Sequence, residues 1–201
     1  MRIGVDFDNT LVCYDRAFAT VGKEEGLLPA DFAGGKDAAK RWLYRERPDG
    51  YLWERLQGLV YGRRIDHAEL YEGAAEFLRR CRQGGWPVYI VSHKTVLAHH
   101  DPRQTNLRES ALAWMKRQGF FAKNGCGLAE THVYFEDTRE AKVRRIGDLD
   151  CQIFVDDLPE VLGHAGMPAA CRKILFRTEH SGPFERAASW TEVRDAVFNR
   201  S

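Results

Sequence analysis

The sequence predicts an α/β fold: a Rossmann-like parallel sheet flanked by helices, with a small α-helical cap insertion. Short apolar runs rich in β-branched and aromatic residues are typical of buried parallel strands, and they recur at residues 2–7, 88–91, 131–135, 152–155 and 173–176. Helical patterns between these runs cover residues 74–80, 106–118 and 140–146. Strands and helices that alternate in this way form right-handed crossovers, so we expect the strands to be parallel, with helices on both faces of the sheet.

The segment between the first two strands is far longer than an ordinary crossover connection. Residues 15–75 show helical patterning and no convincing strand, with apolar side chains at helical spacing in 37–45 and again in 51–60. A helical insertion explains this length. We therefore predict two parts: an α/β catalytic core of residues 1–14 and 76–201, and a helical cap insertion of residues 15–75.

Composition and charge exclude several classes of partner. The 201 residues are 44% hydrophobic, and 30 Lys and Arg against 29 Asp and Glu give a net charge of +1. This balance offers no electrostatic footprint for nucleic acid or an anionic membrane, so we expect neither as a partner. The oligomeric state stays open.

The sequence also bears on the compartment. Asp6 and Asp8 interrupt any signal-peptide pattern, and no run of about eighteen apolar residues exists. Five irregularly spaced cysteines fit reduced thiols better than a disulfide framework. We therefore expect a soluble, cytoplasmic protein.

Carboxylates stand at the ends of two predicted strands. Asp6 and Asp8 end the first strand, and Asp156 and Asp157 end the fourth. Parallel sheets bind ligands outside the carboxyl ends of their strands. Four carboxylates gathered there repel one another unless a divalent cation stands between them, and Mg²⁺ prefers such hard oxygen ligands. The sequence therefore predicts a magnesium site.

Two further strand ends supply groups that suit an anionic substrate. Ser92 directly follows the second strand and offers a hydroxyl, and Lys142 lies on the helix after the third strand. His93 is a further candidate for contact with substrate. Together with the carboxylates these residues suit phosphoryl transfer, because a cation and a lysine neutralise charge while a positioned carboxylate attacks in line.

These residues resemble the motifs of the haloacid dehalogenase (HAD) superfamily of phosphohydrolases. The order and strand context match across roughly residues 1–160, and the insertion occupies the place of the cap between the first and second motifs. The third motif is assigned to Lys142, and Arg139, Arg144 and Arg145 are neighbouring alternatives. The motifs correspond to Asp6-Phe7-Asp8-Asn9-Thr10 (DxDxT), Ser92, Lys142 and the pair Asp156-Asp157.

The resemblance implies a role for each residue. Asp6 is the nucleophile that forms an aspartyl-phosphate, and Asp8 protonates the leaving oxygen and then activates water. Mg²⁺ is held by Asp6, the main-chain carbonyl of Asp8, and Asp156, with Asp157 acting through a bound water. The transferring phosphoryl group is bound by Ser92 and Lys142. The resemblance also implies that the first strand lies between the second and the fourth.

We therefore expect a magnesium-dependent phosphoric monoester hydrolase acting on a small phosphorylated metabolite. A phosphotransferase or phosphomutase that passes the same group to another alcohol is not separated from this by the motifs. A dehalogenase fits less well, because halide displacement does not require the acid/base group of Asp8. A non-catalytic phospho-receiver module uses similar residue types, but here the acidic pair comes last and a receiver has no place for the insertion.

The insertion carries aromatic and basic residues with two interpretations. Core packing is the favoured role of the aromatics, and a solvated face is the simplest role of the arginines. Lining of a substrate pocket is the alternative for both sets. The residues are Trp42, Tyr44, Tyr51 and Trp53, and Arg41, Arg45 and Arg47.

Overall fold

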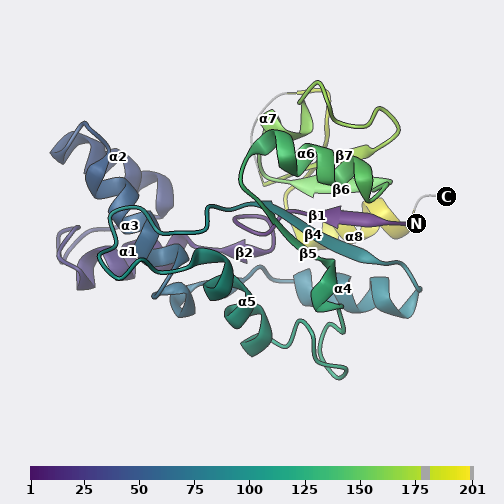
Figure 1. Ribbon diagram of the computed structural model, residues 1–201, viewed down its shortest axis with the longest axis horizontal. Coiled ribbons are helices and arrows are strands. Elements are labelled where there is room, and N and C mark those ends of the chain that lie inside the picture. The colour runs from purple at the N-terminus through teal and green to yellow at the C-terminus, as the bar shows by residue number, and fades with distance from the viewer. Residues whose placement is uncertain (178–181, 200–201) are drawn as a thin grey trace. The chain divides into compact units, whose positions relative to one another are not determined.

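The computed structural model describes residues 1–177 and 182–199. Within this part of the chain, six parallel strands form one sheet in the order β5-β4-β1-β6-β7-β8 (Figure 1). This confirms the predicted fold class and the position of the first strand between the second and the fourth. The strands are β1 (Ile3–Val5), β4 (Val88–His93), β5 (Val133–Glu136), β6 (Ile153–Asp156), β7 (Arg172–Phe176) and β8 (Glu185–Ala187).

Helices cover both faces of this sheet, and in Figure 1 α6 and α7 lie above it while α4 lies below. The side chains under α6 and α7 form an apolar cluster that includes Val143, Phe154 and Leu162. On the other side, the ring of Phe77 on α4 lies 4.9 Å from that of Trp190 on α8, centroid to centroid. The helices are α4 (Ala74–Gln83), α6 (Arg139–Asp148), α7 (Pro159–Leu162) and α8 (Trp190–Phe198), with a short 3-10 turn at Glu130–His132.

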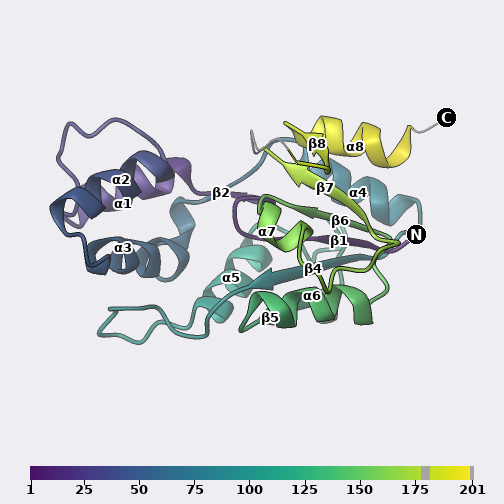
Figure 2. The same cartoon turned by 90° about the horizontal axis from the view of Figure 1, so that it is seen from above.

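A second compact unit is helical and consists of Cys13–Glu69 and Thr95–Gln118. Figure 2 shows its helices α1, α2 and α3 packed together. Its core contains Phe18 stacked on Trp53, with ring centroids 5.0 Å apart. Trp53 is buried, as core packing requires. The helices are α1 (Asp15–Glu24), α2 (Lys36–Glu46), α3 (Tyr51–Tyr61) and α5 (Leu107–Arg117), with a 3-10 turn at Ile65–His67.

The boundaries of the two units differ from those expected. Thr95–Gln118 lies in the helical unit, whereas the sequence analysis placed it in the core. The reason is close packing on α3: a Cβ atom at Gly58 would lie 2.8 Å from the carbonyl oxygen of His99. The sheet unit consists of Met1–Val12, Leu70–Lys94 and Gly119–Ser201, of which 178–181 and 200–201 lie outside the described residues.

The insertion also holds a short strand that the sequence analysis did not expect. Strand β3 (Glu69–Leu70) pairs with β2 (Val12–Cys13) in a two-stranded sheet. Both strands have two residues, too few for any side-chain alternation to show in the sequence.

All five cysteines are free thiols. Across residues 1–177 and 182–199, no helix has the length and apolar character that a membrane crossing requires.

Candidate active site

The register of the central strands places two carboxylates side by side. Val5 of β1 pairs with Val155 of β6, so Asp6 and Asp156, the next residues along these parallel strands, lie at the same edge of the sheet. The backbone N–H of Asp6 donates to the carbonyl oxygen of Val155 at 2.9 Å. This edge is the carboxyl end of the strands, where parallel sheets bind ligands.

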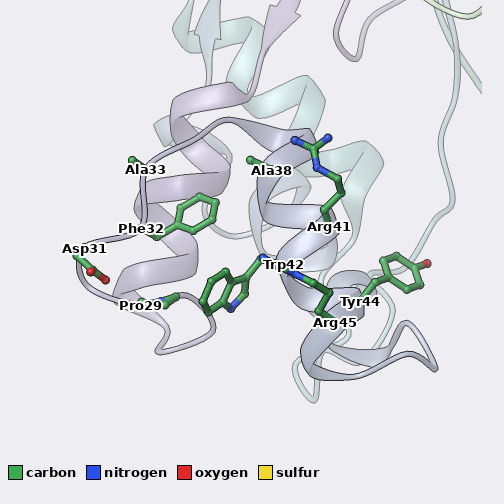
Figure 3. A pocket seen from close by; sticks show the side chains of 9 residues that line it. All are labelled: Pro29, Asp31, Phe32, Ala33, Ala38, Arg41, Trp42, Tyr44 and Arg45. Atoms are coloured by element: carbon green, nitrogen blue, oxygen red, sulfur yellow. The ribbon is translucent and has the colours of Figure 1, made fainter.

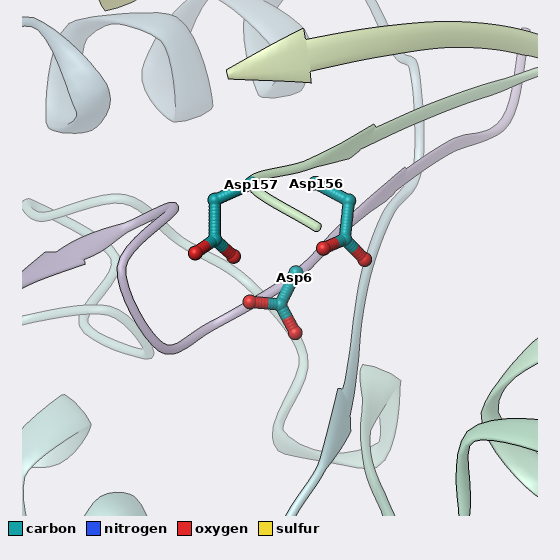
Figure 4. Close-up of side chains that lie close together, drawn as sticks. All are labelled: Asp6, Asp156 and Asp157. Carbon is teal, nitrogen blue, oxygen red and sulfur yellow. The ribbon is translucent and has the colours of Figure 1, made fainter. Parts of the chain in front are cut away.

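Three carboxylates gather at this edge (Figure 4). One oxygen each from Asp6, Asp156 and Asp157 lies within 4.8 Å of the others. Asp6 is 4% exposed and Asp156 fully buried, whereas Asp157 is partly exposed. Buried carboxylates this close together are costly without compensating positive charge.

The loop after β1 is held in a tight turn that fixes this geometry. The carbonyl oxygen of Phe7 accepts hydrogen bonds from the N–H groups of Leu11 and Val12, each at 3.1 Å. Asn9 adopts a left-handed φ of 60°, which asparagine tolerates better than most residues. The turn therefore depends on the residue type at position 9.

Thr10 connects this turn to the acidic pair after β6. Its hydroxyl donates to Asp157 at 3.3 Å and accepts from the backbone N–H of Asp157 at 3.1 Å. The indole N–H of Trp190 donates to the carbonyl oxygen of Thr10 at 3.0 Å. Thr10 therefore braces the loop and positions the third carboxylate of the cluster.

Lys142 supplies positive charge to the cluster. Its Nζ lies 2.7 Å from Oδ1 of Asp6 and 2.6 Å from Oδ2 of Asp156, with its side chain 2% exposed. The Thr138 hydroxyl caps the N-terminus of α6 by accepting from the N–H of Ala141 at 3.1 Å, which starts the helix one turn before Lys142. Of the four basic residues near this position, the structure brings Lys142 to Asp6: Arg145 pairs with Glu136, and Arg139 and Arg144 are exposed.

Two carboxylates share one ammonium group, and this arrangement sets the pKa of Lys142 and of Asp156. Burial opposes the charge of Lys142, but the attraction of Asp156 and Asp6 outweighs burial, so the pKa of Lys142 is raised above its ordinary value. Burial also raises the pKa of Asp156, to about 6, although Lys142 opposes that shift and the charge of Asp6 adds to it. The cluster is therefore short of positive charge.

Asp8 lies apart from the three clustered carboxylates and has its own basic partner. Nζ of Lys94 is 2.8 Å from Oδ2 of Asp8, with side chains 2% and 16% exposed. Lys94 was not among the residues expected from the sequence, although a signal was available: side chains alternate along a strand, so Lys94 lies on the same side as Ser92. The structure thus adds a buried lysine to the candidate site.

Ser92 and His93 are neighbours on β4 that differ in burial and in the strand they face. Ser92 is buried at the strand end next to β1. His93 is exposed, and its Nε2 lies 3.0 Å from the carbonyl oxygen of Asp137, which follows β5 on the far side of β4 from β1. The ring of His93 therefore leans away from Asp6, and a role in phosphate binding stays a prediction.

The donor set fits a hard divalent cation. Three carboxylates within 4.8 Å of one another, two of them buried and served by a single lysine, leave negative charge for a cation to neutralise. Mg²⁺ suits such all-oxygen sites, since it binds through one or two carboxylates and keeps several waters. Asp6, Asp156 and Asp157 are the side chains that would hold it.

Comparison with known proteins establishes the fold. No protein-family model and no curated protein matches the sequence. Solved structures do match. A HAD-family hydrolase from Deinococcus radiodurans R1 with bound phosphate and sodium is 18% identical, with 98% of this chain and 95% of that chain covered and a TM-score of 0.58.

Two further structures show how widely this fold is used. A D,D-heptose 1,7-bisphosphate phosphatase from B. bronchiseptica, complexed with magnesium and phosphate, is 11% identical over 100% of both chains, with a TM-score of 0.56. A dehalogenase is 14% identical over 100% of this chain and 97% of that chain, with a TM-score of 0.54. The chain therefore has the fold of HAD-superfamily hydrolases, a fold that serves both phosphatases and dehalogenases.

Proposed function

We propose that this chain is a HAD-superfamily phosphatase that requires Mg²⁺ and hydrolyses a small phosphate monoester through an aspartyl-phosphate on Asp6. The observation that carries the proposal is the buried group of Asp6, Asp156 and Lys142 at the carboxyl edge of the sheet, with Asp157 beside it. This arrangement combines a nucleophile, a cation site and a lysine for an anionic substrate.

The reaction is a double displacement. An oxygen of Asp6 attacks phosphorus, the bond from phosphorus to the ester oxygen breaks, and the protonated carboxyl group of Asp8 gives its proton to the leaving oxygen and becomes a carboxylate. Asp8 then takes a proton from water as the water oxygen attacks phosphorus, which releases Asp6 and inorganic phosphate. Mg²⁺, when bound, neutralises charge on the phosphoryl oxygens. Lys142 and Ser92 bind the same oxygens.

Asp8 favours phosphatase over dehalogenase chemistry. Halide is a stable leaving group that needs no proton, whereas an alkoxide needs one. Nζ of the buried Lys94 lies 2.8 Å from Oδ2 of Asp8, where it can hold the carboxyl group of Asp8 in one position. The proposal therefore assigns Lys94 the positioning of Asp8.

The helical unit, which contains most of the insertion at 15–75, is proposed to act as a cap that selects the substrate. Its small size favours a small phosphorylated metabolite over a protein. A lid of this kind excludes water and commits the bound substrate to reaction.

Release of inorganic phosphate tests this function. The purified chain is incubated with a panel of sugar phosphates and nucleoside monophosphates, with Mg²⁺ or with excess chelator. We expect release from at least one ester with Mg²⁺ and none with chelator, and inhibition by Ca²⁺, whose looser coordination misplaces the nucleophile. Full turnover in chelator would contradict the metal requirement, and transfer of phosphate to added alcohols instead of water would identify a phosphotransferase.

Replacing Lys94 with methionine tests the positioning of Asp8. We expect hydrolysis of alkyl phosphates to fall by about 10- to 100-fold, less than the roughly 10²–10⁴-fold that a positioned acid/base group contributes, because Asp8 itself remains. Hydrolysis of an aryl phosphate should fall much less, because its leaving group needs little protonation. Lys123→Met, on an exposed lysine of the sheet unit, is the matched control and should behave as wild type. Equal losses on both esters would show that Lys94 does not act through Asp8.

A further inference from the structure

The helical unit carries a pocket of about 710 Å³ that shares no residue with the acidic site (Figure 3). Its lining residues lie within positions 29–45, on the loop before α2 and on α2 itself. Small-molecule sites in proteins have volumes of roughly 300–1,000 Å³, so the pocket is large enough for a nucleotide-sized ligand.

One wall of the pocket is aromatic. Phe32 on the loop and Trp42 on α2 point toward one another, with ring centroids 6.3 Å apart and planes at 76° (Figure 3). Both side chains are only partly buried. Core packing, the favoured interpretation of the sequence, thus holds for Trp53 but not fully for Trp42, part of whose surface is exposed.

Positive charge flanks this wall. Arg41 and Arg45 lie four residues apart on α2 and therefore share a face of the helix. The guanidinium carbon of Arg45 lies 5.1 Å from the centroid of the Trp42 ring. Stacking on an aromatic face holds a guanidinium in one plane and leaves its N–H edges open to an anion. Among the described residues, no carboxylate is within ion-pair distance of either arginine.

We propose that this pocket binds a planar aromatic anion of the chemistry of a nucleoside monophosphate. The phosphate pairs with Arg41 and Arg45, and the base packs on Trp42 and Phe32. Asp31 lines the pocket on the loop, across from the arginines in Figure 3, and accepts hydrogen bonds from sugar hydroxyls or an exocyclic amine. With two guanidiniums against one carboxylate, the pocket favours a ligand with net negative charge.

Calorimetric titration with adenosine monophosphate tests the proposal, in chelator so that the ligand stays intact. Binding should weaken about tenfold or more in Arg41→Gln/Arg45→Gln, which loses paired charge-assisted hydrogen bonds. It should weaken by a similar factor in Trp42→Leu, which loses the stacking surface. Lys23→Gln, on an exposed lysine of α1, removes a charge outside the pocket and should bind as wild type.

Two simpler probes separate the parts of the ligand. Adenosine, which lacks the charge, and inorganic phosphate, which lacks the base, should each bind at least about tenfold more weakly than adenosine monophosphate. No measurable binding of adenosine monophosphate, or equal binding by wild type and all pocket variants, would overturn the proposal. If inorganic phosphate alone bound as tightly as adenosine monophosphate, the proposed packing of the base on Trp42 and Phe32 would be wrong. The arginine variants change exposed side chains, so they keep the test valid if Trp42→Leu fails to fold.

Discussion

Replacing Lys142 with methionine is expected to lower the free energy of unfolding of the metal-free protein by about 3–5 kcal/mol, the typical cost of removing one partner from a buried ion pair. The side chain is 2% exposed and is the shared counter-charge of Asp6 and Asp156, at 2.7 and 2.6 Å. Methionine fills similar space but leaves two buried carboxylates facing each other. Urea unfolding monitored by circular dichroism in chelator measures the loss.

Two comparisons make this measurement specific. Lys142→Met/Asp156→Asn removes one of the stranded carboxylates, so it should recover part of the loss. Lys123→Met, on the surface of the same unit, should stay within about 0.5 kcal/mol of wild type. A loss below about 1 kcal/mol in Lys142→Met would mean that Lys142 does not compensate the buried charge.

Replacing Asp6 with asparagine is expected to reduce phosphate release by at least about a thousandfold, because the amide cannot attack phosphorus and the nucleophile carries much of the rate enhancement. The variant should remain folded, since its amide oxygen still accepts from Lys142 and Asp156 keeps its ion pair. Phosphate release measures the loss of activity, and a melting curve on the same preparation shows whether the variant is folded.

Asp148→Asn is the matched control for this variant. It makes the same chemical change at an exposed position on α6 and should retain full activity. Residual turnover of Asp6→Asn within tenfold of wild type, with an unchanged melting curve, would remove Asp6 from the role of nucleophile.

The sheet could be read from the sequence because its strands are buried. Apolar runs bounded by glycine and charged residues located β1, β4, β5, β6 and β7 to within a few residues. Strand β8 was missed because its sequence, Glu-Arg-Ala, pairs only with β7 at the sheet edge and needs no apolar run. The place of α5 was misjudged for a different reason. Its segment joins the helical unit through a close approach at Gly58, where the missing side chain leaves no pattern to read.

The candidate site was predictable where a residue's function follows from its place at a strand end. Asp6, Asp8, Asp156 and Asp157 were expected to gather there; Asp6, Asp156 and Asp157 lie together, whereas Asp8 pairs with Lys94. Lys142 was one of four basic residues within 139–145, and only the helix phase and the Thr138 cap select it. Lys94 was missed because the prediction stopped at His93, one residue before the position that strand alternation places on the same side as Ser92.

The residue on which a trapped phosphoryl group is found decides whether Asp6 is the nucleophile. Asp8→Asn is mixed with Mg²⁺ and acetyl phosphate, whose leaving group needs no proton, then quenched in acid, digested and analysed by mass spectrometry. Because this variant lacks the base that activates water, we expect a phosphoryl group to accumulate on Asp6 and to be absent from Asp6→Asn/Asp8→Asn. Phosphate release by the wild-type protein combined with label on another residue, or with no label in Asp8→Asn, would contradict it.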